Sequence, residues 1–162
     1  MARSVPLSRF APRVGGGSAF FVRRIGAHIV SDTTKWKERV ERESLASLMS
    51  DTRWSQLVAA LVDAHILPQF RVKVVGEREP SLGWESSFPH HLPSPYLCIE
   101  WLELSGRFSR RRGRLIPDEV VDRSGELEQI LHQTRVPFTA DGSVFRVWGH
   151  VAPGLSPQFV SQ

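Results

Sequence analysis

Six histidines and one cysteine are the residues best suited to catalysis or metal binding in this chain of 162 residues. No two histidines are four positions apart, the spacing that places two ligands on one face of a helix. His90 and His91 are adjacent in a proline-rich segment with Glu85 nearby, but neighbouring side chains of an extended loop point in opposite directions. We therefore expect no metal site and no cofactor.

Catalytic motifs are equally scarce. Cys98 lies in a stretch expected to be a buried strand, where a thiol has a raised pKa and behaves as a small hydrophobic group. The chain has no Gly-x-Ser-x-Gly motif, and its Gly15-Gly16-Gly17 run lacks the Lys-Ser/Thr ending of a phosphate-binding loop. We expect no catalytic residue and no enzymatic activity, although the fold could still bring together four polar residues, namely Glu100, Glu103, His132 and His150.

An arginine cluster is the densest set of charges, and it comprises Arg107, Arg110, Arg111, Arg112 and Arg114 around Phe108. Guanidinium groups bind phosphates in a forked geometry and an aromatic ring can stack on a base, so the cluster is typical of a nucleic-acid contact. The same arginines could instead bind an acidic protein, or pair with acids of this chain at positions 118, 119 and 122. Nucleic acid is therefore the alternative to a protein partner.

A second candidate surface is the segment 76–95, which contains four prolines and no pattern of regular structure. A loop of this length inside a compact domain is unusual and often functional. Its Trp84 and Phe88 are suited to anchoring a partner, although Trp84 could equally fold back over the sheet. We expect a protein-binding surface formed by Trp84, Phe88 and the arginine cluster.

Composition and charge exclude several classes of protein. Hydrophobic residues make up 41% and charged residues 23%, which is typical of a globular domain. No apolar run approaches the roughly 20 residues that a membrane span needs. A single cysteine excludes an intrachain disulfide and fits a reducing, cytoplasmic compartment. The net charge of +4 belongs to residues 1–31, which hold five arginines and no acid, because the remaining residues carry 16 basic and 17 acidic side chains.

The same shift in composition divides the chain into three parts. We interpret residues 1–32 as a disordered, arginine-rich leader, with a transit peptide or a misplaced start as alternatives. Residues 33–152 are expected to form the domain, and residues 153–162 a flexible C-terminal tail.

Hydrophobic periodicity predicts the elements of that domain. One helix is expected over residues 35–48 and a second after Ser50, a good N-cap followed by an apolar stripe that includes Trp54. Residues 69–75 and 96–104 read as strands, and Trp101 is expected in the core on the same face as Ile99. If these two strands pair, Glu100 and Glu103 could meet cations at positions 71 and 73.

A third helix is expected to begin at Asp122 or Ser124, followed by a hairpin around Asp141-Gly142. These elements predict a single α+β domain. It has two N-terminal helices, a mainly antiparallel sheet of four to five strands and one further helix packed on the sheet.

Four segments of the chain resemble an uncharacterised family of small bacterial proteins, a domain of unknown function: residues 47–54, 99–104, 112–115 and 145–150. The resemblance covers about residues 45–151 and implies a bacterial cytoplasmic protein with one domain, but no chemistry. We expect a non-enzymatic domain of the toxin-immunity or regulatory kind that binds another protein.

Overall fold

The computed structural model describes residues 32–110, 113 and 117–161, and every structural statement below concerns these residues. Residues 1–31 of the expected leader lie outside them, as do Arg111, Arg112 and Arg114 of the arginine cluster. The elements follow in the order α1 (Asp32–Arg42), β1 (Ala46–Ser47), α2 (Asp51–Asp63), β2 (Gln69–Val74), the 3₁₀ turn η2 (Tyr96–Cys98), β3 (Ile99–Ser105), β4 (Arg107–Arg110), β5 (Glu119–Asp122), α3 (Ser124–Gln133), β6 (Phe138–Asp141), β7 (Val144–Trp148) and β8 (His150–Val151).

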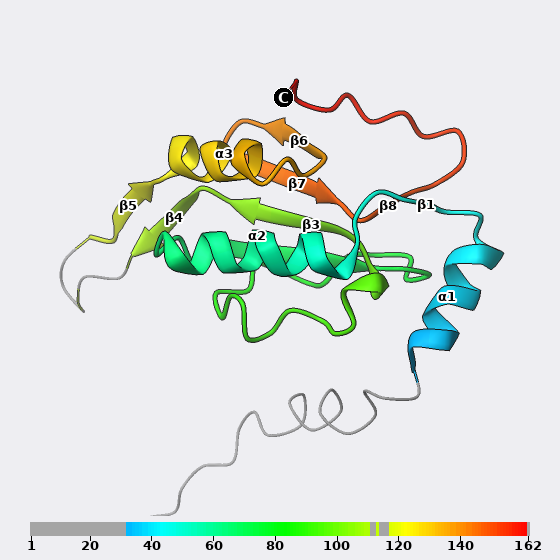
Figure 1. Cartoon of the computed structure of the whole chain (residues 1–162). Coiled ribbons are helices and arrows are strands. Elements are labelled where there is room, and N and C mark those ends of the chain that lie inside the picture. Colours follow the sequence, from blue (N-terminus) through cyan, green and yellow to red (C-terminus); the bar gives the residue numbers. More distant parts are fainter. Residues whose placement is uncertain (1–31, 111–112, 114–116, 162) are drawn as a thin grey trace, which may run out of the picture.

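An antiparallel sheet of four strands, in the order β2-β3-β7-β6, forms the centre of the molecule (Figure 1). Two short ribbons, β1-β8 and β4-β5, flank it. The β6-β7 hairpin turns at Gly142, whose φ of 58° suits glycine, and this confirms the predicted hairpin. The predicted α+β class is also confirmed, with β3 as a central strand between β2 and β7.

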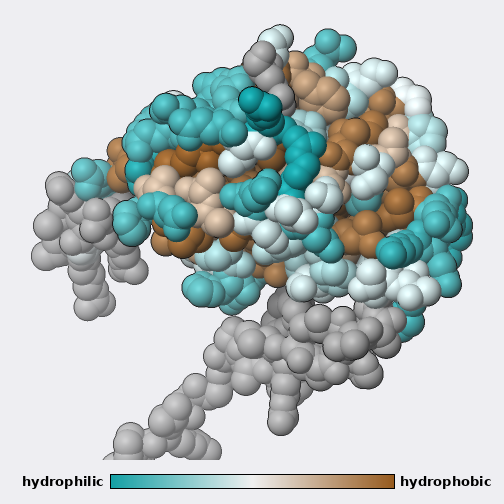
Figure 2. Space-filling view, in the orientation of Figure 1, coloured by the Kyte–Doolittle hydropathy of each residue, from teal (hydrophilic) through white to brown (hydrophobic). Residues whose placement is uncertain are grey.

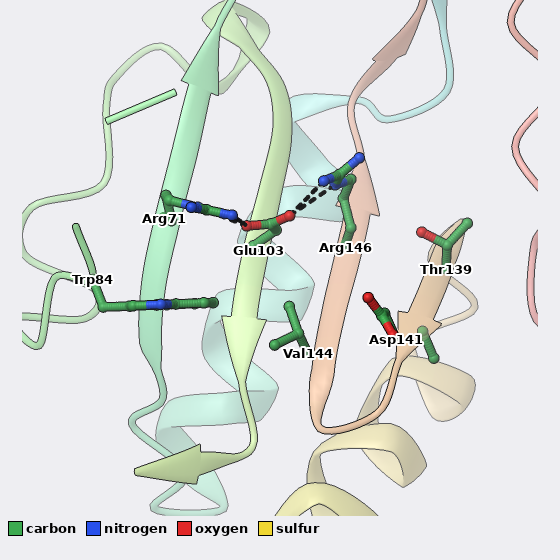
Figure 3. Close-up of a pocket in the computed structure, with 8 residues that line it drawn as sticks. Arg71, Trp84, Glu103, Thr139, Asp141, Val144 and Arg146 are labelled. Atoms are coloured by element: carbon green, nitrogen blue, oxygen red, sulfur yellow. Dashed lines mark hydrogen bonds and ion pairs between the residues drawn. The ribbon is translucent and has the colours of Figure 1, made fainter. Parts of the chain in front are cut away.

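Helices α2 and α3 cover one face of this sheet (Figures 1 and 3). The predicted N-cap of α2 is confirmed, because the Ser50 hydroxyl accepts a hydrogen bond from the Arg53 backbone N–H at 3.3 Å. Both helices bury an apolar stripe in one core cluster with the sheet. Its largest fully buried members are Trp54, Leu57, Leu61, Phe70, Ile99, Leu102, Leu104, Leu127, Leu131, Phe138 and Phe145. Seen from this side, the surface alternates hydrophobic and hydrophilic areas (Figure 2).

The first helix is shorter than predicted, since it ends at Arg42 and not near residue 48. Ser44 adopts a left-handed φ of 52°, and the N–H of Leu45 donates to the carbonyl of Val40 at 3.0 Å. This is the geometry of a helix C-cap, which glycine usually signals in a sequence. The residues that follow form β1, in which Ala46 pairs with Val151.

The predicted alternation along β3 is wrong at its start. Lys73 pairs with Trp101 and the next residue, Val74, pairs with Ile99, so the register shifts by one residue around Glu100. Ile99 therefore joins the core cluster together with Leu102, and does not share the face of Trp101.

The loop 76–95 lies along the outer edge of β2. Phe70 and Glu85 exchange both backbone hydrogen bonds at 2.8 Å, and the N–H of Ser81 donates to the carbonyl of Val72 at 2.8 Å. Since these bonds satisfy the edge of the sheet, they also fix Trp84 beside β2. At the opposite edge, the N–H of Val160 donates to the carbonyl of Phe138 on β6 at 3.0 Å.

Candidate functional site

The sheet face opposite the helices carries three charged residues in one row across three strands (Figure 3). Antiparallel register places Arg71 of β2 and Arg146 of β7 on either side of Glu103 of β3. The Nε and Nη2 atoms of Arg71 donate to Glu103 Oε2 at 2.8 and 2.5 Å. Those of Arg146 donate to Glu103 Oε1 at 3.1 and 2.5 Å. Both carboxylate oxygens are therefore occupied by one guanidinium group each.

We call Arg71, Glu103 and Arg146 the charged triad. The carboxylate is nearly inaccessible, with a side chain 4% exposed, whereas the two arginine side chains are 35% and 36% exposed. A carboxylate this deep in a protein is tolerated because it is paired and fully hydrogen-bonded. Two cations share one anion, so the triad has a net charge of +1.

The predicted link between the two strands is confirmed. β2 and β3 pair, and Glu103 meets Arg71 in the triad. In the neighbouring row, Lys73 Nζ donates to Glu100 Oε1 at 2.7 Å.

The arginines of the triad lie over tryptophan rings. The guanidinium of Arg146 lies 4.4 Å from the ring centroid of Trp101 and 5.3 Å from that of Trp148. The guanidinium of Arg71 lies 5.4 Å from the ring of Trp84. At these distances the rings attract the cations and restrict their movement. Trp101 is buried as expected, but it lies against Arg146 on this face and outside the core cluster.

A hollow of about 380 Å³ opens beside the triad and is lined by Arg71, Trp84, Glu103, Thr139, Ala140, Asp141, Val144 and Arg146 (Figure 3). Trp84 reaches across β2 from the loop to form one wall, and Thr139 and Asp141 of β6 form the opposite one. Trp84 thus folds back over the sheet while 40% of its surface stays exposed. We call these lining residues, with Trp101 and Trp148, the open face.

A second hollow of about 520 Å³ lies at the start of α2, and its lining includes Lys37, Asp51 and Arg53. It has no tryptophan in its lining, and Arg53 there already donates to two backbone carbonyls, those of Leu48 and Arg135. Although this second hollow is larger, its described lining lacks the pair of arginines and the tryptophan that the hollow beside the triad offers to a partner.

The expected contact residues are not all at the surface. Phe88 is 3% exposed and packs edge-on against Phe70 in the core, with ring centroids 5.9 Å apart. This corrects its assignment to a binding surface, because a buried ring that holds the loop on the sheet cannot contact a partner. Trp84 is the residue of this pair that is available for contact.

Only part of the arginine cluster can be placed. Arg107 is exposed at the start of β4, and the backbone of Arg110 ends that strand. Register sets Arg107 opposite Asp122 and Arg110 opposite Glu119 on β5. Arg107 thus lies opposite an acid of the same chain, and the nucleic-acid alternative stays a prediction.

The four polar residues weighed for catalysis do not gather. Of Glu100, Glu103, His132 and His150, Glu103 alone lines the hollow. His132 packs against the core ring of Phe138, with centroids 5.1 Å apart. His150 is buried and its Nε2 donates to the carbonyl of Leu97 at 2.8 Å. Burial lowers the pKa of His150, which favours the neutral ring.

The thiol of Cys98 is unreactive in this environment, because burial raises its pKa to about 12.

The histidine pair considered for metal binding lies in the loop 76–95, where His91 Nδ1 is 3.4 Å from a carboxylate oxygen of Glu85. In the part of the chain that the structure describes, no three histidine, cysteine or acidic side chains are arranged to hold a metal ion.

Arg146, Trp148 and Thr139 are site residues that sequence reasoning missed. The alternation Phe145-Arg146-Val147 places Arg146 on the polar face of β7, but only the pairing of β7 with β3 shows which acid it meets. Trp148 Nε1 donates to the hydroxyl of Thr139 at 3.2 Å, which ties β7 to β6 on the same face.

Neither a curated protein nor a solved structure matches the chain. Among the described residues, no helix has the length and apolar character needed to cross a membrane. A family model matches residues 36–154, a range that includes every residue lining the hollow on the open face. Since this match covers well over half of the 162 residues, the chain belongs to DUF6678, a family of unknown function.

Proposed function

We propose that this protein is a non-enzymatic binding domain that recognises another protein through the open face. The observation that carries the proposal is the charged triad, in which two arginines are held by one buried glutamate and lie over tryptophan rings. Arginine and tryptophan are the residue types most enriched at the energetic centres of protein interfaces.

Rigidity of the open face supports this proposal. Arginine side chains normally lose much conformational freedom when they become ordered in a complex. Here Glu103 and the rings have already ordered both guanidinium groups. A partner would therefore meet a preformed surface, and less of its binding energy would be spent on ordering it.

A binding role also agrees with the distribution of ionisable groups. Glu103 has both oxygens hydrogen-bonded to arginines, so each oxygen already has a partner within the chain. His150 and Cys98 are buried, and neither lines the hollow. These placements favour recognition over proton transfer or nucleophilic attack.

The cellular setting belongs to the same proposal. We place the protein in the bacterial cytoplasm, with a role of the toxin-immunity or regulatory kind. The single cysteine fits a reducing compartment, and a small domain with one preformed surface suits the capture of one partner.

The test is recovery of a partner from the native cells by the tagged full chain and two variants. Trp84→Ala removes the exposed wall of the hollow, whereas Leu82→Ala removes a fully exposed residue of the same loop that does not line it. We expect the wild type and Leu82→Ala to recover the same protein, and Trp84→Ala to lose it. Equal recovery by all three would place the contact elsewhere and refute the proposal.

A further inference from the structure

The open face carries two partly exposed arginines at the place where it is hollowed. We propose that the hollow binds a carboxylate between Arg71 and Arg146, supplied by an aspartate or glutamate side chain of the protein partner. The identity of the source rests on the proposed function, whereas binding of the carboxylate itself does not.

Unused hydrogen-bond donors are the first support. Each guanidinium donates to Glu103 through Nε and Nη2, and neither forms a hydrogen bond through Nη1 with any residue that the structure describes. Both side chains are about one-third exposed and both line the hollow. Arginine binds carboxylates through more than one edge of its planar group, so the donors needed for a second acid are present.

The distribution of charge across the hollow is the second support. Arg71 and Arg146 lie on one side with Glu103, whereas the only other charged residue of the lining, Asp141, lies on the opposite wall and brings the net charge of the whole lining to zero. The excess positive charge is therefore confined to the triad. A carboxylate placed against the triad would interact with the two guanidinium groups through charge-assisted hydrogen bonds.

The opposite wall of the hollow explains why a carboxylate is favoured over a doubly charged anion. Asp141 lines this wall and would repel an excess of negative charge. The Thr139 hydroxyl accepts a hydrogen bond from Trp148 Nε1, which leaves its own proton available to donate. The ring of Trp84 and the side chain of Val144 provide apolar contact for the methylene groups of an acidic side chain.

The experiment uses the full chain and a matched pair of probes. N-acetyl-glutamic acid amide carries one side-chain carboxylate, and N-acetyl-glutamine amide is its uncharged isostere. Each is titrated while NMR follows the arginine Nε–H and tryptophan Nε1–H signals. We expect the acid to shift the signals of Arg146 and Trp84 saturably, with a Kd in the millimolar range, which is about that of a single charge-assisted contact. The amide should leave them unchanged.

Three variants make the outcome specific. Glu103→Gln raises the net charge of the triad from +1 to +2, and we expect it to lower the Kd for the acid about tenfold. Arg146→Gln should abolish saturable binding. Lys73→Gln should change the Kd less than twofold, since Lys73 pairs with Glu100 and does not line the hollow.

Three results would overturn the proposal: the acid causes no saturable shifts in the wild type, the amide causes equal shifts, or Glu103→Gln does not lower the Kd for the acid. Equal shifts from sulfate at matched ionic strength would also overturn it, because a doubly charged anion would then bind as well as a carboxylate. Partner recovery that survives Trp84→Ala refutes the proposed function independently, because the titration requires no partner.

Discussion

The two faces of the central sheet use the same strands for different purposes. On the helix-covered face, Leu102 and Leu104 of β3 are completely buried in an apolar cluster. On the open face, Trp101 and Glu103 of the same strand join a network of rings and charges. Because successive side chains of a strand point to opposite sides, one short sequence supplies both surfaces.

The two faces differ in how strongly they depend on the direction of their interactions. Apolar burial is favourable in any orientation, so the helix-covered face tolerates volume-conserving changes. The charged triad depends on hydrogen-bond geometry from three strands at once. Loss of Glu103 leaves both arginines without their acceptor, and loss of either arginine leaves one carboxylate oxygen without its donors. The first face provides most of the stability, whereas the second presents a fixed arrangement of donors to solvent.

The largest expected effect is on the helix-covered face. Trp54→Ala removes a ring that is 1% exposed, and the resulting cavity should lower the free energy of unfolding by about 3–5 kcal/mol. Urea unfolding followed by circular dichroism measures this change. A loss below about 1 kcal/mol would contradict the assignment of the stabilising core to this face.

A smaller loss is expected when the buried acid of the triad is removed. Glu103→Ala leaves two guanidinium groups close together without their shared anion, so the free energy of unfolding should fall by about 2–3 kcal/mol. The same urea unfolding assay applies. Glu103→Gln is the control, because its amide oxygen still accepts a hydrogen bond and its loss should be smaller. An equal loss in both variants would contradict this expectation, because it would assign the stabilisation to the charge of the carboxylate and none of it to the retained hydrogen-bond acceptor.

His150 should make stability depend on pH. Burial lowers its pKa below the ordinary value of 6.5, so the unfolded chain binds a proton before the folded chain does. Stability therefore falls as the pH decreases from about 6.5 toward the folded pKa, and is retained above it. Urea midpoints at pH 7.5 and 5.5 measure the effect. His150→Gln should reduce the difference, and an unchanged difference would assign it to other groups.

Trp84→Ala should have the smallest effect on stability. The residue is 40% exposed and lies outside the core cluster, so we expect a change below about 1 kcal/mol in urea unfolding. The same variant should lose the partner. A loss of several kcal/mol would mean that Trp84 holds the loop in place, which the structure assigns to Phe88.

The elements with strong local signals were predictable from sequence. Ser50 caps the helix that directly follows it, and Asp141-Gly142 forms the turn between the two strands that flank it. Both signals depend on residues close in sequence, and both predictions are confirmed. The end of α1 was not predictable, because a serine at position 44 takes the left-handed conformation that usually indicates glycine.

The open face was predictable only in part. The alternation in β2 and β3 paired Arg71 with Glu103, but nothing local shows that β7 lies on the other side of β3 and brings Arg146 to the same acid. The burial of Phe88 was unpredictable for the same reason. The sequence around an aromatic residue in a loop does not differ between a ring that is exposed and one that is buried, as Phe88 is against Phe70. Contacts between residues far apart in the chain decide both cases.

We propose that the partner contacts the open face and not the helix-covered face. Positions 84 and 62 offer a matched comparison, because Trp84 and Val62 are 40% and 39% exposed on the loop and on α2, respectively. The direct test places a photo-crosslinking amino acid at each position and irradiates the native cells. We predict one discrete crosslinked protein from position 84 and none from position 62. The same crosslinked protein from position 62, or none from position 84, would contradict the account.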